Sequence, residues 1–282
     1  MKVVARQAEM TELARRWRRA GESIGFAPTM GALHRGHASL IERARRENRR
    51  VVVSVFVNPT QFGPREDYAR YPRAFSKDLR LCAAGGADVV YHPTAEQIYP
   101  EGFLTSVEVE GLSDVLCGES RPGHFRGVAT IVLKLLETVR PARAYFGEKD
   151  YHQLAIIRRM VQDLGCDAEI VGCPTVRESD GLALSSRNAY LAPLERSAAP
   201  LLYAALKLGK RLTQDGALAP QAISARVRWQ ILKSIPGAGI DYVSLVDAST
   251  LKPARALRGP LRLLAAIRLG KTRLIDNIAL SL

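Results

Sequence analysis

Over the first 173 residues, short apolar runs with strand character alternate with longer segments of helical periodicity, which predicts a doubly wound α/β fold. The run RVVVSVFV at 50–57 is almost continuously apolar, as expected of a parallel strand that is covered on both faces. After about residue 175 this alternation stops. We therefore expect a Rossmann-like domain with a parallel sheet over 1–175, followed by a smaller α+β C-terminal domain over 176–282.

The expected elements of the first domain follow from the spacing of its apolar residues. An amphipathic helix comes first, with Met10, Leu13, Ala14 and Trp17 on one face. The expected strands are 22–27, 50–57, 87–92, 142–147 and 168–173. The helices between them, with apolar residues at i, i+3 and i+4, are expected at 37–49, 77–86, 127–140 and 150–165.

The second domain is expected to begin near the polar stretch VRESDG at 176–181. Residues 190–234 are rich in Ala, Leu and Arg, which is typical of helices. The segments 240–250, 260–269 and 271–280 resemble strands, which we expect to form a small mixed sheet.

The composition is that of an ordinary soluble protein, with 47% hydrophobic and 24% charged residues. No run approaches the roughly 18 apolar residues of a membrane span. The four cysteines form no C-x-x-C pair and lack zinc-ligand spacing, so we expect buried free thiols in a reducing compartment. These features favour a cytoplasmic protein that does not bind a membrane.

The chain is strongly basic, with 41 Lys and Arg against 28 Asp and Glu and a net charge of +13. Such a charge attracts polyphosphates and nucleic acids alike. The basic residues are scattered, however, and the aromatic residues that stack on bases are not interleaved with them. We therefore expect an anionic small molecule and no nucleic acid, and keep an RNA-binding protein as the alternative.

The segment GFAPTMGALHRGHASLI at 25–41 predicts a strand, a turn and a helix. In a parallel sheet, such a turn lies where ligands bind, and the free N–H groups of the helix start favour phosphate. Gly31 allows close approach of the backbone, and Gly36 leaves room for a flat group such as adenine. His34 and His37 are expected on one helix face, where imidazoles can donate to phosphate oxygens. A third ligand for a metal ion is missing.

The tetrapeptide HRGH at 34–37 resembles the HxGH signature of the nucleotidyltransferase and class I synthetase superfamily. The longer segment is similar to the pantothenate synthetase (pantoate–β-alanine ligase) family. The resemblance covers most of residues 22–192 and returns near the C-terminus. It continues through VSVFVNPTQFGPREDYARYPR, SRPGHFRGVATIVLKLL, YFGEKDYHQLAIIRRMV, PTVRESDGLALSSRNAYL and GKTRLIDN.

This resemblance implies an ATP-dependent ligase that condenses (R)-pantoate with β-alanine through a pantoyl adenylate. It implies ATP as a substrate, Mg²⁺ carried with the phosphates, and a homodimer. The sequence offers no G-x-S-x-G elbow or other acyl-enzyme nucleophile, which agrees with activation by adenylation. A nucleotidyltransferase of the same fold, acting on another small acceptor, remains the alternative.

The resemblance also implies roles for individual residues. His37, His34 and Lys149 would stabilise the transition state, Asp150 would bind ribose, and the LSSR loop would grip the triphosphate. The implied ATP-binding set is Met30, Gly31, Ala32, Leu33, His34, Arg35, Gly36, His37, Gly147, Glu148, Lys149, Asp150, Val176, Leu184, Ser185, Ser186 and Arg187.

For pantoate, the resemblance implies the amides of Gln61 and Gln153, with Asn58 and Tyr71 as further ligands. Candidates for an apolar wall are Pro28, Met30 and Phe62, and less direct candidates for the site are Asp78, Arg121, His124 and Arg126. Two positions depart from the family pattern, His152 and Lys77, and either could alter substrate affinity or metal contact.

Overall fold

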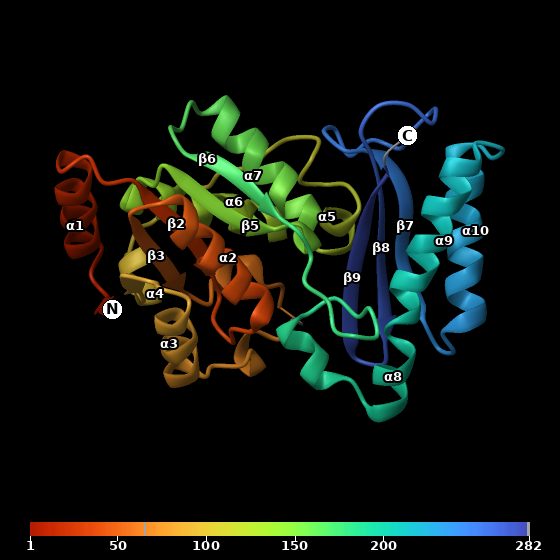
Figure 1. Ribbon diagram of the computed structural model, residues 1–282, viewed down its shortest axis with the longest axis horizontal. Coiled ribbons are helices and arrows are strands. Elements are labelled where there is room, and N and C mark those ends of the chain that lie inside the picture. Colours follow the sequence, from red (N-terminus) through yellow and green to blue (C-terminus); the bar gives the residue numbers. More distant parts are fainter. Residues whose placement is uncertain (65, 281–282) are drawn as a thin grey trace. The chain divides into compact units, whose positions relative to one another are not determined.

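The five expected strands of the first 173 residues form one parallel sheet in the computed structural model, which describes residues 1–64 and 66–280 (Figure 1). An additional short strand, β1, pairs with β4 at the sheet edge. This strand is not apparent from the sequence, because three residues are too few to show a period. The strands are β1 (Lys2–Val4), β2 (Ile24–Thr29), β3 (Arg50–Val55), β4 (Val89–Tyr91), β5 (Arg143–Gly147) and β6 (Glu169–Cys173).

The strand order β1-β4-β3-β2-β5-β6 places a topological switch point between β2 and β5. The chain builds outward from β2 through β3 and β4, then returns to the other side of β2 with β5. Ligands of such sheets bind beyond the carboxyl ends of the strands at this point. The HRGH motif follows β2, and the GEKD segment ends β5 and leads into α7, as the sequence predicts.

Helices cover the sheet on both sides (Figure 1). α2 and α3 pack on the face to which Val51, Val53 and Val55 point, and α1 and α6 pack against each other and against β2. The larger helices are α1 (Gln7–Arg19), α2 (Arg35–Glu47), α3 (Phe75–Ala84), α6 (His124–Val139) and α7 (Tyr151–Asp163). Shorter elements are η1 (Pro59–Gln61), η2 (Tyr68–Arg70), α4 (Ala95–Ile98), α5 (Cys117–Ser120) and η3 (Glu148–Asp150).

The C-terminal part contains a three-stranded sheet in the order β7-β8-β9 whose core packs against α9 and α10. The expectation of a mixed sheet is wrong, because both pairs are antiparallel. Only Gly270 and Lys271 separate β8 from β9, and so short a connection can form only a hairpin. The elements are η4 (Ser186–Tyr190), α8 (Pro193–Ala198), α9 (Leu201–Asp215), α10 (Pro220–Ser234), β7 (Gly239–Asp247), β8 (Leu261–Leu269) and β9 (Thr272–Leu280).

The described residues divide into two compact units. Unit 1 contains Met1–Asp114, Arg121–Glu148 and Ile156–Pro174, whereas unit 2 contains Val115–Ser120, Lys149–Ala155 and the described residues from Thr175 onward. The domain boundary that the sequence predicts between residues 175 and 176 stays a prediction.

The cysteines agree largely with expectation. Cys82, Cys117 and Cys173 are buried, Cys166 is half-buried, and all four are free thiols. Burial raises the pKa of Cys82 to about 12, so this thiol is uncharged at neutral pH. Among residues 1–64 and 66–280, no helix is both long enough and apolar enough to cross a membrane.

Candidate active site

The turn after β2 is held in one conformation by hydrogen bonds to its neighbours. The Thr29 hydroxyl donates to the carbonyl oxygen of Ser54 on β3 at 2.7 Å and accepts from the Gly31 N–H at 3.2 Å. Gly31 has φ +85°, and a Cβ atom there would lie 3.0 Å from Asp78 Oδ2. Glycine therefore meets both a conformational and a steric requirement at this position.

Asp78, on the first turn of α3, holds the other half of this turn. Its carboxylate accepts the N–H of Ala32 at 3.0 Å and that of Leu33 at 2.7 Å. Ala32 has φ +51°, an unfavourable conformation for alanine that these bonds help to maintain. The Asp78 side chain is 1% exposed. Asp78 therefore positions the backbone that the sequence predicts to bind ATP.

His34 and His37 form a capping box at the start of α2. His34 Nδ1 accepts from the Gly36 N–H at 3.1 Å, and His37 Nδ1 accepts from the His34 N–H at 3.2 Å. The expectation that both lie on one helix face is corrected: His34 is the N-cap, with extended φ −137° and ψ 178°, and precedes the helix. The ring centroids are nevertheless 4.1 Å apart.

These hydrogen bonds assign the tautomer of both rings. Because each Nδ1 accepts an N–H, a neutral imidazole carries its proton on Nε2. His34 and His37 thus supply two Nε2–H donors beside the N-terminal N–H groups of α2. The arrangement suits an anion, since the helix dipole adds partial positive charge at the same place.

Beyond β3, Asn58 fixes the side chain of Gln61. Asn58 Nδ2 donates to Gln61 Oε1 and to the carbonyl oxygen of Gly127, both at 3.1 Å. The hydroxyl of Tyr99 donates to Asn58 Oδ1 at 2.7 Å. Gln61 Nε2 then points at Met30 Sδ, 2.9 Å away. The Gln61 amide is therefore oriented with its NH₂ group as the donor toward Met30.

Gly127 lets α6 approach η1 closely enough for these contacts. A Cβ atom at this position would lie 2.4 Å from the carbonyl oxygen of Thr60 and 2.7 Å from the Gln61 nitrogen. Both neighbours are backbone atoms, which cannot move aside cheaply.

We expect Gly127→Ala to lower the free energy of unfolding by about 1–3 kcal/mol through overpacking. Denaturant unfolding measures this change. The matched control is Gly63→Ala, because a Cβ at Gly63 has its nearest neighbour at 3.7 Å. Equal stabilities of the two variants would contradict the steric account.

Arg121 and His124, two of the less direct candidates for the site, hold the backbone of Gln61. His124 Nδ1 lies 2.8 Å from the Gln61 carbonyl oxygen, and Arg121 Nη1 lies 2.8 Å from His124 Nε2. Arginine only donates, so His124 is neutral and protonated on Nδ1. Burial would raise the pKa of Glu66, but the hydrogen bonds and charge of Arg121 outweigh it and lower that pKa. The Arg126 side chain is exposed.

Tyr71 is buried and packs with Phe62, whose ring centroid lies 5.9 Å from its own. The Phe62 ring also lies 5.4 Å from that of Tyr68. Phe62 is the aromatic member of the candidate apolar wall, and the two tyrosine rings pack against it. Pro28, near the end of β2, is half-buried.

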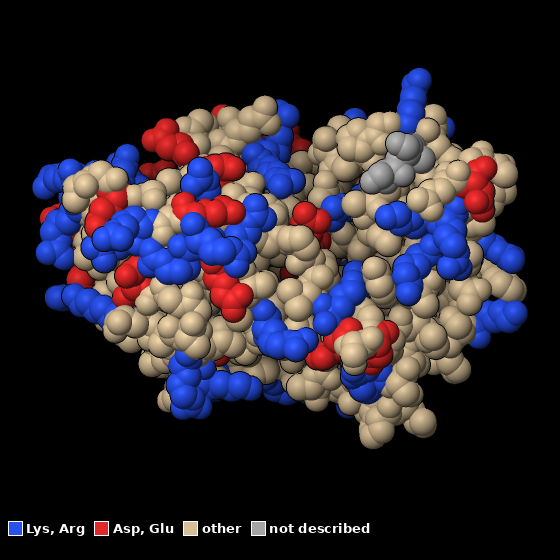
Figure 2. Space-filling model, in the orientation of Figure 1, with Lys and Arg blue, Asp and Glu red and all other residues tan. Residues whose placement is uncertain are grey.

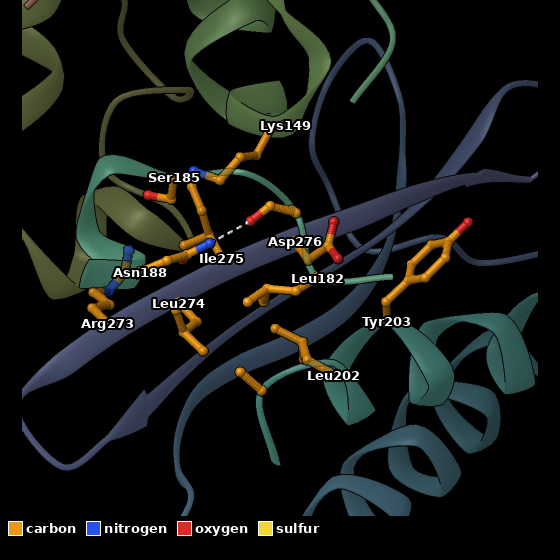
Figure 3. Close-up of a pocket in the computed structure, with 12 residues that line it drawn as sticks. Lys149, Leu182, Ser185, Asn188, Leu202, Tyr203, Arg273, Leu274, Ile275 and Asp276 are labelled. Carbon is orange, nitrogen blue, oxygen red and sulfur yellow. Dashed lines mark hydrogen bonds between the residues drawn. The ribbon is translucent and has the colours of Figure 1, made fainter. Parts of the chain in front are cut away.

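In unit 2, a small cavity brings together two of the predicted ATP-binding segments (Figure 3). The cavity is small, with a volume of about 20 Å³. Lys149 of GEKD and Ser185 of LSSR both line it, together with Asn188, Tyr203 and Asp276. The structure thus joins a lysine and a serine that lie far apart in the sequence.

The LSSR loop follows a tight turn. Leu184 donates its N–H to the Val176 carbonyl oxygen at 3.0 Å, closing the turn at its base. Ser185 is the N-cap of η4, and its hydroxyl accepts from the Arg187 N–H at 3.3 Å. Ser186 and Arg187 are half-buried. This local structure predicts a defined resting conformation for the loop.

On the first turn of α7, Gln153 is half-buried and His152 is buried. Lys77 is exposed on α3.

The candidate residues form two sets, one in each unit. Unit 1 holds those from Pro28 to Glu148, and unit 2 holds Lys149, Asp150, Gln153, Val176 and Leu184–Arg187. Among the described residues, no group of three or more His, Cys, Asp or Glu could hold a metal ion.

Asp276 and Asn277 are not among the site residues that the sequence predicts. Their signal was present, since two polar residues interrupt the apolar strand pattern inside GKTRLIDN. Asn277 Nδ2 donates to the Lys149 carbonyl oxygen at 2.9 Å, and Asp276 pairs with Arg177 at 2.6 Å. Both contacts reach segments of the candidate site.

Comparison with known proteins gives consistent matches over the whole chain. The family model described as pantoate–β-alanine ligase matches residues 2–279. The pantothenate synthetase of Moorella thermoacetica is 53% identical over 263 residues, covering 93% of each chain. That of Geobacillus kaustophilus is 50% identical over 282 residues, covering 100% of this chain and 94% of the relative.

Solved structures agree. The crystal structure of pantothenate synthetase from Thermus thermophilus has a TM-score of 0.93 and 49% identity, covering 99% of both chains. The pantoate–β-alanine ligase of Francisella tularensis, complexed with beta-gamma ATP and beta-alanine, has a TM-score of 0.80 and 36% identity. That match covers 99% of this chain and 97% of the other.

Proposed function

Because the chain belongs to the pantoate–β-alanine ligase family, it is an ATP-dependent ligase of pantoate and β-alanine, and we propose that it works through a pantoyl adenylate. In the first step, the pantoate carboxylate attacks the α-phosphorus of ATP and pyrophosphate leaves. In the second, the β-alanine amine attacks the acyl carbon and AMP leaves. The observation that carries the function is the family match over residues 2–279.

The adenylation step shifts negative charge onto the departing pyrophosphate, which positioned donors stabilise. We assign this role to the Nε2–H groups of His34 and His37, which the capping box directs as a pair of donors. Lys149 supplies a point charge for the α-phosphate. Catalysis then depends on positioning and charge rather than on a covalent enzyme intermediate.

The remaining ATP contacts are proposed from the family motifs. In unit 1 the segment Met30–His37 and the pair Gly147–Glu148 offer backbone N–H groups. In unit 2 Asp150 would bind ribose hydroxyls, Val176 adenine, and Leu184–Arg187 the triphosphate. Mg²⁺ would arrive on the phosphate oxygens, the hard ligands it prefers, because the side chains proposed around the phosphates are mainly donors.

Pantoate offers a carboxylate and hydroxyl groups, which amide side chains recognise well. Gln61 and Gln153 are the proposed ligands, with Asn58 and Tyr71 in support. The observation that supports Gln61 is the hydrogen bond from Asn58, which fixes its amide orientation. Pro28, Met30 and Phe62 would face the gem-dimethyl group.

We expect Gln153→Ala to raise the KM for pantoate about 10-fold, the loss of roughly one to two hydrogen bonds. The KM for ATP should change less than about twofold, since the amide is assigned to pantoate. Steady-state kinetics with each substrate varied separately measures both. Gln162→Ala, an exposed position on the same helix, is the control. An effect confined to ATP would contradict the assignment.

The distribution of charge supports a small-molecule substrate over nucleic acid. Figure 2 shows Lys and Arg dispersed over the visible face with Asp and Glu among them. Several arginines of the described residues are paired with acidic residues, for example Arg50 with Glu22 and Arg143 with Glu169. On this face the positive charge is thus not collected into one continuous track for a nucleic-acid backbone (Figure 2).

A cytoplasmic location and a homodimeric assembly are part of the same proposal. The free cysteines support a reducing compartment. The dimer rests on the resemblance to a family that is typically dimeric, and sedimentation equilibrium tests it directly. A monomer at assay concentration would remove the dimer from the proposal without touching the chemistry.

The decisive experiment is exchange of labelled pyrophosphate into ATP, with pantoate and Mg²⁺ but without β-alanine. Pantoate-dependent exchange establishes reversible adenylation, because only a bound acyl adenylate can return label to ATP. Absence of exchange in a folded, ATP-binding protein contradicts a free-standing adenylation step. Repeating the assay with β-alanine, and following AMP, then shows whether the acceptor must bind first or another acceptor is used.

A further inference from the structure

Two adjacent buried polar residues on β9 contact two different segments of the proposed ATP site. Asp276 and Asn277 are 4% and 5% exposed, in a strand otherwise built mainly of apolar residues. Successive side chains of a strand point to opposite faces. Asp276 shares the face of Leu274 and Leu280, which pack toward α9, and Asn277 lies on the other face. β9 is an edge strand, so segments on both faces are within reach.

Asn277 holds the backbone of the GEKD segment. Its Nδ2 donates to the Lys149 carbonyl oxygen at 2.9 Å, while its Oδ1 accepts from Arg262 Nη1 at 2.7 Å. The Arg262 guanidinium lies 3.7 Å from the centroid of the Tyr151 ring, and the Tyr151 hydroxyl donates to the Ala248 carbonyl oxygen at 2.9 Å. Because Arg262 can only donate, the orientation of the Asn277 amide is determined.

Asp276 holds the turn that leads to the LSSR loop. Its carboxylate accepts two hydrogen bonds from Arg177, at 2.6 and 2.8 Å. Arg177 also donates to the Gly181 carbonyl oxygen at 3.1 Å and lies 3.5 Å over the Tyr203 ring. The backbone N–H of Asn277 donates to Asp276 Oδ1 at 2.8 Å, so the Asp276 carboxylate is also held by the backbone of its neighbour. A bidentate pair of this kind restrains direction as well as distance.

We propose that Asp276 and Asn277 are positioning residues for adenylation, which hold the Lys149 backbone and the base of the 176–184 turn in register with one another. The lysine ammonium sits on a flexible four-carbon stem, so a fixed backbone limits the volume that it explores. Ser185 follows the same turn and lines one cavity with Lys149 and Asp276 (Figure 3). This inference rests on the proposed function of Lys149 and the LSSR loop.

The test begins with Asn277→Asp, which keeps an acceptor for Arg262 and turns an oxygen instead of a donor toward the Lys149 carbonyl. We expect the rate of pantoate-dependent pyrophosphate exchange to fall about 10- to 100-fold, the usual cost of a displacement near 1 Å. The KM for pantoate should stay within about twofold. Asn277→Ala is made in parallel, because alanine introduces no charge that could pair with the lysine ammonium.

A control separates positioning from general loss of stability. Thr213→Val removes a buried hydrogen bond of α9, from the Thr213 hydroxyl to the Gly209 carbonyl oxygen at 2.8 Å, in the same unit. It touches neither ATP segment. At a temperature well below every Tm, this variant should exchange pyrophosphate at the wild-type rate.

A double-mutant cycle with Lys149→Ala identifies the route of the effect. If Asn277 acts through Lys149, Asn277→Ala should cost less than about threefold once the ammonium is gone. The inference would be overturned if the rate loss of the double variant equalled the product of the losses of Asn277→Ala and Lys149→Ala. Such a result would show that the effect of Asn277 is independent of Lys149. Exchange within twofold of wild type in folded Asn277 variants would also overturn the inference.

Asp276→Asn tests the proposed role of Asp276 in holding the turn before the LSSR loop. It also replaces the Asn277 variants as the test if these fail to fold. It weakens the Arg177 pair and should lower exchange by a similar factor, with a raised KM for ATP because the LSSR turn is loosened. Unchanged kinetics would overturn its role. Absence from the wild type of both pyrophosphate exchange and β-alanine-dependent AMP formation would instead overturn the proposed function, and the two failures are thereby distinguished.

Discussion

Replacement of His37 by alanine is expected to lower the rate of pantoate-dependent pyrophosphate exchange by about 10²- to 10³-fold, as loss of one transition-state donor does elsewhere. The KM for pantoate should change little, because the proposed partner of the His37 Nε2–H is phosphate. The capping box supports this direction, since the other ring nitrogen accepts the His34 N–H. Exchange assays at saturating and limiting pantoate measure both quantities.

The hydrogen bond from the His34 N–H to His37 also contributes to stability, so His37→Ala changes stability as well as rate. His37→Ala also removes a cap of α2, which should cost about 1 kcal/mol of the free energy of unfolding. His37→Gln is the matched control, because glutamine at this position can reach back to the N-cap N–H as in an ordinary capping box. It should recover most of the stability and little of the rate. Wild-type exchange in a folded His37→Ala protein would remove His37 from the chemistry.

Lys149→Ala is expected to lower exchange by about 10³-fold, equivalent to roughly 4 kcal/mol of transition-state stabilisation. The ammonium is the point charge proposed for the α-phosphate, where charge develops as pyrophosphate leaves. The KM for pantoate should stay within about twofold. Lys149→Arg should restore only part of the rate, because the guanidinium is larger and donates as a planar fork.

A control for overall charge is needed in so basic a protein. Lys233→Ala removes the same charge from an exposed position on α10 and should leave exchange unchanged. If both lysine variants lose activity equally, long-range attraction of ATP explains the effect, and the local role of Lys149 is wrong. Repeating the assays at high salt strengthens the distinction, since long-range attraction is screened.

Local patterns in the sequence were sufficient for most of the fold. The continuous apolar run at 50–57 gave β3, the alternation of strands and helices gave the parallel sheet, and the HRGH segment was predicted as a strand, a turn and a helix start. The individual strands and helices are visible in the sequence because apolar residues that are close in the chain recur with a regular period. The family motifs likewise identified the reaction, because each motif is a continuous stretch.

Only the tertiary structure showed which residues hold the motif segments in place through hydrogen bonds. Asp78 binds the N–H of Leu33 across 45 residues, and Asn277 binds the carbonyl of Lys149 across 128. The sequence shows such residues as isolated polar positions, because a hydrogen bond between distant segments leaves no period. The sequence therefore determined the fold class and the reaction of this protein, whereas long-range hydrogen bonds, visible only in the folded chain, decided which buried side chains hold the segments that carry the family motifs.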